Sequence, residues 1–205
     1  MTKAKSRFFA YLERLRWIKR WGLMRNVVEE NVMEHSWQVS TIAHMLAVID
    51  KEMFNGTTNP ADVATTALYH DTSEIITGDL PTPIKYHSKK ITDAYKEIEK
   101  EAEHELLGLL PPALQSSLRP YLLHDHIDPE VNQLIKAADL ISAYLKCQVE
   151  CNAGNKEFDD AKTSIEQSIR ALDMPAVGYY MQTFTDSYLL TLDELLREHD
   201  KQTDK

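Results

Sequence analysis

Apolar residues recur every three to four positions along most of this chain, and the strict alternation of apolar and polar residues that marks strands is nearly absent. This spacing predicts helices, because it gathers the apolar side chains on one face of each segment. The sequence therefore predicts an all-α fold, a single helical bundle of about seven helices, with a disordered tail at residues 199–205. The predicted helices cover residues 8–18, 35–49, 60–70, 95–106, 129–149, 158–169 and 177–195.

Individual residues mark two helix starts and one loop. Asn59-Pro60 and Asp128-Pro129 each place a capping side chain before a proline at the first helical position. Residues 78–83 hold a glycine and two prolines, so we expect an irregular loop there. No repeat, low-complexity segment or linker interrupts the pattern, which favours one domain over residues 1–205.

Charge is distributed unevenly along the chain. The formal net charge is −9, from 23 Lys and Arg against 32 Asp and Glu, which disfavours a nucleic-acid polymer or an anionic membrane as partner. Residues 1–26 nevertheless carry eight of the bases and a single acid. A transit peptide or a membrane-surface helix is a less favoured explanation of this basic segment.

The sequence also predicts a cytoplasmic location. No run approaches the roughly 20 apolar residues that a membrane span needs, and the N-terminus lacks the pattern of a secretory signal. Cys147 and Cys151 lie four residues apart in a helical pattern. We interpret them as free thiols in a reducing compartment rather than as a redox or metal-binding pair.

One His-Asp dipeptide lies in a context that suggests chemistry. His70-Asp71 follows an apolar helical face, and Glu74 comes one turn later, so a helix would place His70 and Glu74 on one face with Asp71 beside them. Polar groups at the end of a buried face are costly unless they are paired or bind a metal. A hydrogen-bonded pair between a core histidine and an acid is the alternative.

Two other His-Asp dipeptides are weaker candidates. His199-Asp200 lies in the polar tail, where a rigid dry site is implausible. His124-Asp125-His126 precedes a helix start, and exposed loop histidines are the commoner case there. We therefore assign no role to this second motif.

Two further polar residues, His35 and Asp139, interrupt apolar helical faces. Asp139 lies among apolar neighbours, and a buried carboxylate needs a cationic partner. Imidazole and carboxylate are ligands of Zn, Mn, Co, Ni and Fe. Together with His70 and Asp71 these residues could form a metal site with open coordination positions, as a hydrolytic metal requires.

The order His35, His70-Asp71, Asp139 resembles that of the HD-domain metal-dependent phosphohydrolases. Further segments resemble the bacterial 5′-deoxynucleotidase family within that superfamily, and the resemblance covers residues 8–194. These segments are Arg20-Trp21 and residues 31–36, 69–74, 77–86, 136–139, 143–147 and 153–155.

The resemblance implies an HD-type domain that hydrolyses 2′-deoxyribonucleoside 5′-monophosphates to deoxynucleoside and phosphate, with loose base specificity, as a homodimer. It implies a divalent cation such as Co²⁺ or Mn²⁺. The implied ligands are His35, His70, Asp71 and Asp139. Glu74 would be the acid/base residue, Arg20 would orient the phosphate, and Trp21 would exclude a 2′-hydroxyl. The implied lining of the nucleotide pocket is Asp71, Asp79, Leu80, Pro81 and Thr82.

Other functions remain open. The chain could hydrolyse another phosphoester, such as a nucleoside triphosphate or a cyclic nucleotide, although a triphosphatase should need more basic residues around its pocket. It could also be a non-catalytic helical module with a structural metal. Without the resemblance, Trp21 would be an ordinary core or interface aromatic, and Asp79 would be a turn residue after Gly78.

Overall fold

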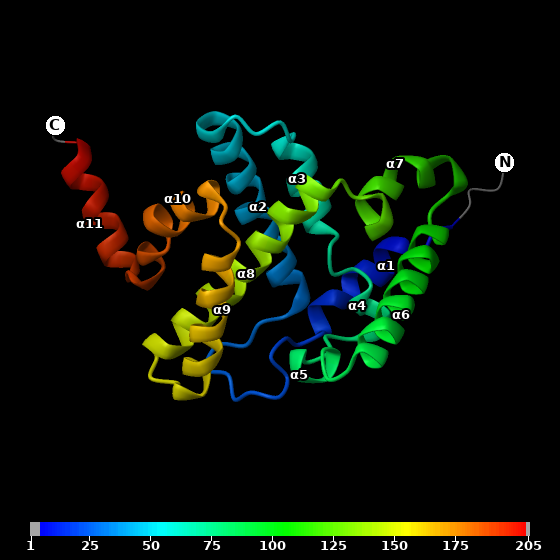
Figure 1. Cartoon of the computed structure of the whole chain (residues 1–205), viewed down its shortest axis with the longest axis horizontal. Helices are drawn as coiled ribbons and strands as arrows, with labels where there is room; N and C mark the ends of the chain where they lie inside the picture. The colour runs from blue at the N-terminus through cyan, green and yellow to red at the C-terminus, as the bar shows by residue number, and fades with distance from the viewer. Residues whose placement is uncertain (1–4, 204–205) are drawn as a thin grey trace.

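A computed structural model describes residues 5–203, with side chains up to Arg197, and within this range the regular structure is entirely helical, which confirms the predicted all-α class (Figure 1). The described residues form eleven α-helices and four short 3₁₀-helices, against about seven helices predicted. The α-helices are α1 Phe8–Leu12, α2 Val32–Phe54, α3 Pro60–Leu68, α4 Glu74–Thr77, α5 Thr82–Lys85, α6 Lys89–Gly108, α7 Pro112–Leu122, α8 Pro129–Asn152, α9 Asp159–Ala171, α10 Pro175–Phe184 and α11 Leu192–Thr203. The 3₁₀-helices are η1 Glu13–Trp17, η2 His124–His126, η3 Lys156–Phe158 and η4 Asp186–Leu189.

The two helix starts that were predicted from the capping residues Asn59 and Asp128 are confirmed. Asn59 Oδ1 accepts from the backbone N–H of Ala61 at 3.0 Å, and Asp128 Oδ1 accepts from that of Glu130 at 2.8 Å. The helix expected near His35 begins earlier, at Val32, because Asn31 and Glu34 form a reciprocal capping box. His35 therefore lies in the first turns of α2, already fixed by regular backbone.

The last predicted helix, residues 177–195, is broken in the structure. α10 ends at Phe184, and η4 separates it from α11. Hydroxyl groups explain the break: Thr185 donates to the carbonyl of Met181 at 2.5 Å, and Ser187 donates to that of Phe184 at 2.7 Å. Such side-chain bonds compete with the helical backbone. α11 continues to Thr203 and so includes part of the tail expected to be disordered, while residues 204–205 lie outside the described residues.

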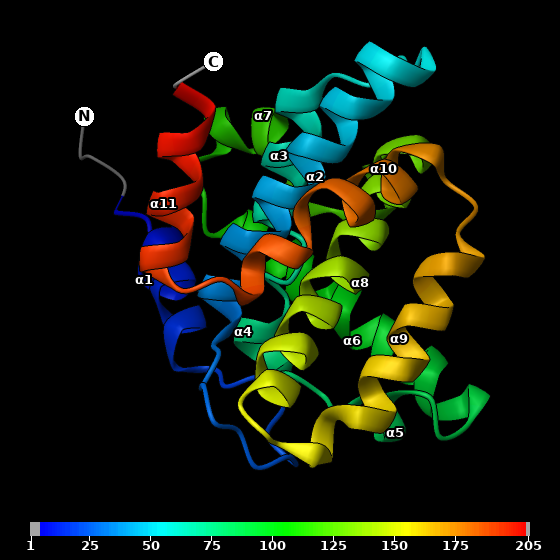
Figure 2. The same ribbon diagram turned by 90° about the vertical axis from the view of Figure 1, so that its left-hand side faces the viewer.

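Two hydrophobic clusters form the core. The larger one joins α2, α3, α8, α9 and α10, and the smaller one joins Phe8 of α1 to α6 and α7. Figures 1 and 2 show α2 and α8 side by side through the centre of the molecule. In Figure 1, α6 and α7 lie to the right of this pair. The segment from α3 to α4 runs between the two clusters, and it carries His70, Asp71 and Glu74.

Cys147 is buried, Cys151 is partly exposed, and both thiols are free. None of the described helices combines the length and apolarity needed to cross a bilayer.

Candidate metal centre and substrate site

Three segments that are distant in sequence meet at one place. His35 comes from the start of α2, His70 and Asp71 from the turn between α3 and α4, and Asp139 from the middle of α8. His35 Nε2 lies 3.1 Å from Asp139 Oδ1 and 3.5 Å from Asp71 Oδ2. His70 Nε2 lies 3.2 Å from the same Asp71 oxygen. Ligand atoms of His35, His70 and Asp71 lie within 4.8 Å of one another, and Asp139 adjoins this group through its contact with His35.

The expected continuous helix through His70 and Glu74 is wrong. α3 ends at Leu68, and residues 69–73 form turns before α4 starts at Glu74. The hydroxyl of Thr72 donates to the carbonyl of Tyr69 at 2.8 Å, which favours this tight turn over a continuing helix. The turn, rather than a shared helical face, brings Glu74 near Asp71, with the Glu74 N–H donating to the Asp71 carbonyl at 3.0 Å.

Hydrogen bonds fix the tautomer of both histidines. His70 Nδ1 lies 2.7 Å from the carbonyl oxygen of Ala67, which can only accept, so this nitrogen carries the proton. Ser142 donates its hydroxyl to Gln38 Oε1 at 2.6 Å, so its oxygen is free to accept from His35 Nδ1 at 3.1 Å. Both Nε2 atoms are then left with lone pairs that point toward carboxylates. They are also among the buried polar atoms of the described residues that have no hydrogen-bond partner.

The electrostatics of the cluster call for a cation. Burial alone would raise the pKa of Asp71, but His70, His35 and Arg20 outweigh it and lower that pKa well below its usual range. Burial also opposes protonation of both histidines, yet the neighbouring carboxylates raise their pKa values. A divalent cation bound by two Nε2 lone pairs and two carboxylates fits this donor set.

Glu74 is a carboxyl group with a different environment. It is almost fully buried, and its Oε2 atom has no hydrogen-bond partner among the described residues. Burial, followed by the charges of Asp71 and Asp79, raises its pKa to about 9. A carboxyl group poised to exchange a proton beside a metal centre is typical of a general acid or base.

Arg20 contacts Asp71, and both Arg20 and the adjacent Trp21 contact Glu30. Arg20 Nη1 is 3.6 Å from Asp71 Oδ2, and Arg20 Nε is 3.7 Å from Glu30 Oε2. The indole N–H of Trp21 donates to the same Glu30 oxygen at 3.0 Å, while the other oxygen of Glu30 lies 3.5 Å from His35 Nδ1. Burial lowers the pKa of Arg20, but four surrounding carboxylates outweigh it and keep the guanidinium charged.

The segment after α4 is placed next to this arginine. Burial raises the pKa of Asp79, while the charge of Arg20 and the nearby backbone of Trp21 act to lower it. Leu80 and Pro81 follow as half-exposed residues, and Thr82 begins α5. The expected irregular loop therefore ends at Pro81, because Pro83 is tolerated in the first turn of a helix. That Leu80, Pro81 and Thr82 line a nucleotide pocket stays a prediction.

Comparison with known proteins now identifies the family. The model of the "5′-deoxynucleotidase YfbR-like" family matches residues 7–188. The chain belongs to this family. It is 48% identical over 191 residues to a Vibrio cholerae 5′-deoxynucleotidase, covering 93% of this chain and 98% of that one. It is 50% identical over 190 residues to a Yersinia pestis 5′-deoxynucleotidase, covering 93% and 96%.

Solved structures agree on the fold. An HD-domain phosphohydrolase from Listeria innocua superposes with a TM-score of 0.77 at 22% identity, covering 96% of each chain. A cyanophage S-2L HD phosphohydrolase, solved with dA and one catalytic Zn²⁺ ion, gives a TM-score of 0.61 at 21% identity, covering 88% of this chain and 95% of that one. The resemblance to HD-domain phosphohydrolases and to the 5′-deoxynucleotidase family is confirmed, and this chain is an enzyme of a hydrolase family.

Sequence reasoning missed three residues that support the site in this YfbR-like enzyme. Glu30 contacts Arg20, Trp21 and His35, whereas Gln38 and Ser142 orient His35. Ser142 lies three residues after Asp139 on the apolar face of α8, and its polarity at that position was a readable signal. Glu30 precedes the helix cap in an acidic segment, and nothing in the local pattern distinguishes it from an exposed acid.

The motif His124-Asp125-His126 forms the 3₁₀-helix η2 at the surface. Asp125 pairs with Lys100 at 2.6 Å, and the backbone N–H of His124 donates to Glu103 Oε2 at 2.9 Å. These contacts fasten the connection between α7 and α8 to α6.

Proposed function

We propose that this chain is a divalent-metal-dependent 5′-deoxynucleotidase that hydrolyses 2′-deoxyribonucleoside 5′-monophosphates to deoxynucleoside and phosphate, with loose base specificity and selectivity against ribonucleotides. The observation that carries the proposal is the pair of unpartnered Nε2 atoms beside Asp71 and Asp139, with Arg20 3.6 Å from Asp71. The names of relatives at about half identity support the reaction.

His35, His70, Asp71 and Asp139 would hold the cation, for which Co²⁺, Mn²⁺ and Zn²⁺ are all chemically suitable. A bound divalent cation lowers the pKa of a coordinated water and neutralises phosphate charge. Asp71 faces both histidines and Arg20, so it would join the metal centre to the phosphate subsite.

Arg20 would bind the phosphate, and Glu74 would transfer the proton. A phosphate monoester carries nearly two negative charges, and a guanidinium can hold two of its oxygens at once. Arg20 is almost buried, so its charge is weakly screened. Glu74 would accept the proton of the attacking water and return it to the departing 5′-oxygen. Asp79, beside the backbone of Trp21, would lie near the sugar together with Leu80, Pro81 and Thr82.

The test of the function is phosphate release from matched 2′-deoxy and ribo 5′-monophosphates of several bases, with Mn²⁺ or Co²⁺ and with a chelator. We expect hydrolysis of each deoxynucleotide, little hydrolysis of ribonucleotides and loss of activity on chelation. Release of pyrophosphate or triphosphate from nucleoside triphosphates at a higher rate would contradict the proposal.

Trp21 is the residue for which we predict a change of specificity. Its indole N–H is bonded to Glu30, and its ring contacts that of Phe158 in a tilted arrangement, with centroids 5.4 Å apart and an interplanar angle of 56°. Trp21→Ala should remove the wall against a 2′-hydroxyl and lower the preference for dAMP over AMP about 10- to 100-fold. The measurement is kcat/KM for both substrates, with Trp17→Ala as the control, because Trp17 is 63% exposed. An unchanged ratio in Trp21→Ala would remove this role.

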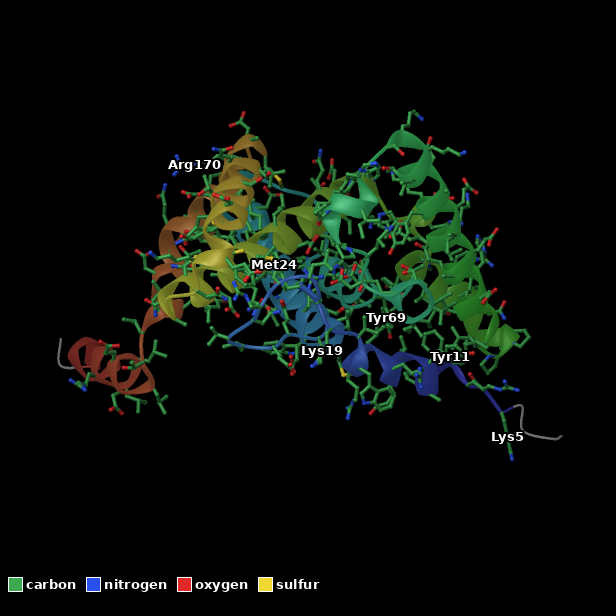
Figure 3. All side chains as sticks on the ribbon, turned by 90° about the horizontal axis from the view of Figure 1, so that it is seen from below. Lys5, Tyr11, Lys19, Met24, Tyr69 and Arg170 are labelled. Carbon is green, nitrogen blue, oxygen red and sulfur yellow. The ribbon has the colours of Figure 1, made fainter. Side chains whose placement is uncertain are left out.

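We further propose that the enzyme is a homodimer. An apolar groove of about 590 Å³ lies between α2, α8 and η4, and Trp37 on its wall is 65% exposed. Helix α11 lies at the edge of the molecule and exposes Leu192, Leu195 and Leu196 (Figures 1 and 3). Two unpartnered apolar surfaces on one chain fit a two-fold pair in which α11 of each copy covers the groove of the other.

Sedimentation equilibrium tests the pairing. The wild-type chain of 23.6 kDa should sediment at twice this mass, and Leu196→Asp should shift it toward the monomer. Asp193→Asn on the same helix is the control and should remain dimeric. A monomeric wild-type protein at micromolar concentration would contradict the pairing.

Partner and location follow from the same proposal. A small phosphate ester suits the acidic chain better than a nucleic-acid polymer or an anionic membrane does. Nucleoside monophosphates are made inside cells, which supports the cytoplasmic location expected from the sequence.

A further inference from the structure

A closed loop, residues 19–31, carries Arg20, Trp21 and Glu30. Its ends are joined by an antiparallel bridge between Lys19 and Asn31, and the backbone N–H of Arg20 donates to the carbonyl of Glu30 at 3.0 Å. No helix or strand occurs between these ends in the described structure. Inside the loop, the N–H of Met24 donates to the carbonyl of Trp21 at 2.9 Å, and the Asn26 side chain donates to the carbonyls of Met24 and Trp21 at 2.9 and 3.3 Å. The far side, residues 25–28, is held by side chains from outside the loop.

Glu150 supplies the principal contact. It lies near the end of α8 and is completely buried. Its carboxylate accepts hydrogen bonds from the backbone N–H groups of Val27 and Val28 at 2.9 and 3.0 Å. Burial raises the pKa of Glu150, but the bond from Lys146 and those from the loop amides lower it to about 2, so the carboxylate is ionised.

Lys146 and Asn155 complete the attachment. The ammonium of Lys146 bonds both Glu150 and the carbonyl of Val28. Asn155 donates to the carbonyl of Arg25 at 2.7 Å and to Glu150 at 2.8 Å. In Figure 3 the loop around Met24 lies against the ribbon of the α8–α9 region, and Figure 2 shows the same proximity. Three polar side chains thus bind four backbone groups on the far side of the loop.

Lys146 also links this group of side chains to Trp21, through the ring of Phe158. The Lys146 ammonium lies 5.5 Å from the ring centroid of Phe158, a fully buried residue whose ring packs on Trp21. Trp21 has a φ of 57°, a left-handed conformation that a bulky residue rarely adopts. Such a conformation persists only where the surroundings fix it. Around Trp21 that constraint comes from Asn26, which donates to its carbonyl, and from Glu30 and Phe158, which contact its indole. The attachment of residues 25–28 to α8 holds this part of the loop against Phe158.

We propose that Lys146, Glu150 and Asn155 form a clamp that holds the 19–31 loop, and that Glu150 is a positioning residue which sets the sugar selectivity of the enzyme through Trp21. The proposal rests on the proposed function, since sugar selectivity is its readout. Among the described residues, the Glu150 carboxylate is hydrogen-bonded to the loop, to Lys146 and to Asn155, and to none of the four candidate metal ligands.

The experiment compares Glu150→Ala with Arg25→Ala, which removes an ion pair to Glu157 from the same loop but leaves the clamp intact, because the Arg25 side chain is 94% exposed. We expect Glu150→Ala to lower the dAMP-over-AMP ratio of kcat/KM about tenfold, with Mn²⁺ affinity by calorimetry unchanged. Arg25→Ala should keep the wild-type ratio. In a Trp21→Ala background, Glu150→Ala should change the ratio no further, because both substitutions act through one side chain.

A second readout does not depend on activity. With Trp17 and Trp37 replaced by Phe, emission reports Trp21 alone, and Glu150→Ala should shift it to longer wavelength and increase acrylamide quenching. A folded Glu150→Ala protein with wild-type selectivity and wild-type Trp21 emission would overturn the clamp while leaving the proposed function standing. If Glu150→Ala does not fold, Asn155→Ala removes only two of the bonds and is judged by the same readouts. If the wild type shows no deoxy preference, the proposed function fails, and the emission alone decides whether the clamp holds Trp21.

Discussion

Asp139→Ala should abolish phosphate release, with a loss of about 10³-fold or more. Asp139 is the only proposed ligand contributed by α8, and it faces His35 Nε2 at 3.1 Å. A metal that supplies several kcal/mol of transition-state stabilisation accounts for a loss of that size when its site is disrupted. The measurements are phosphate release from dAMP and Mn²⁺ binding by calorimetry, and both should collapse together. Chelation of the wild type should give the same loss, reversed by added Mn²⁺.

Gln133→Ala is the matched control for Asp139→Ala, because Gln133 is an exposed residue of the same helix. It should leave both activity and Mn²⁺ binding unchanged. Activity that survives chelation as well as the loss of Asp139 would show that the reaction needs no metal at this site.

Glu74→Gln should lower kcat about 10²- to 10⁴-fold, the usual contribution of a general acid or base. The substitution preserves the size of the side chain and removes its ability to exchange a proton. Mn²⁺ binding should remain, because Glu74 is not one of the four proposed ligands and would act on the proton of a bound water. Loss of Mn²⁺ binding in this variant would instead make Glu74 a ligand. Glu97→Gln, an exposed carboxylate on α6, is the control.

The pH dependence gives a second test of Glu74. Its pKa in the metal-free protein is raised to about 9, so the group is protonated at neutral pH. A divalent cation beside Asp71 would favour the carboxylate and lower that pKa. A base works only when ionised, so the rate of the metal-loaded wild type should rise with pH through the pKa of Glu74. The profile of kcat/KM for Glu74→Gln should lack this limb.

The sequence predicted those parts of the fold that depend on local pattern. Apolar periodicity and the caps at Asn59 and Asp128 located the long helices, because they are read from neighbouring residues. It missed the division of residues 177–195, where hydroxyl groups compete with the backbone, and it missed α7, which contains Pro120 in its interior. Short elements such as α4 and α5 are fixed by tertiary contacts, so local pattern alone does not define them.

The candidate site was predicted in the same partial way. His35, His70, Asp71 and Asp139 stood out because each is a polar residue in an apolar context, and the structure brings them together. Glu30 carried no such signal, since an acid in an acidic segment is expected to be solvated. Its contacts with Trp21 and His35 depend on the path of the 19–31 loop, which is set by residues more than 100 positions away.

The placement of the four candidate ligands has a consequence for the rigidity of the chain. They lie on α2, on the turn that runs between the two hydrophobic clusters, and on α8. A cation bound there would cross-link segments 35, 70–71 and 139 across more than half the length of a chain whose two cysteines are free. Metal binding would then oppose separation of the two hydrophobic clusters. The amide hydrogens of residues 69–74, which lie between the clusters, would exchange more slowly in the metal-loaded protein.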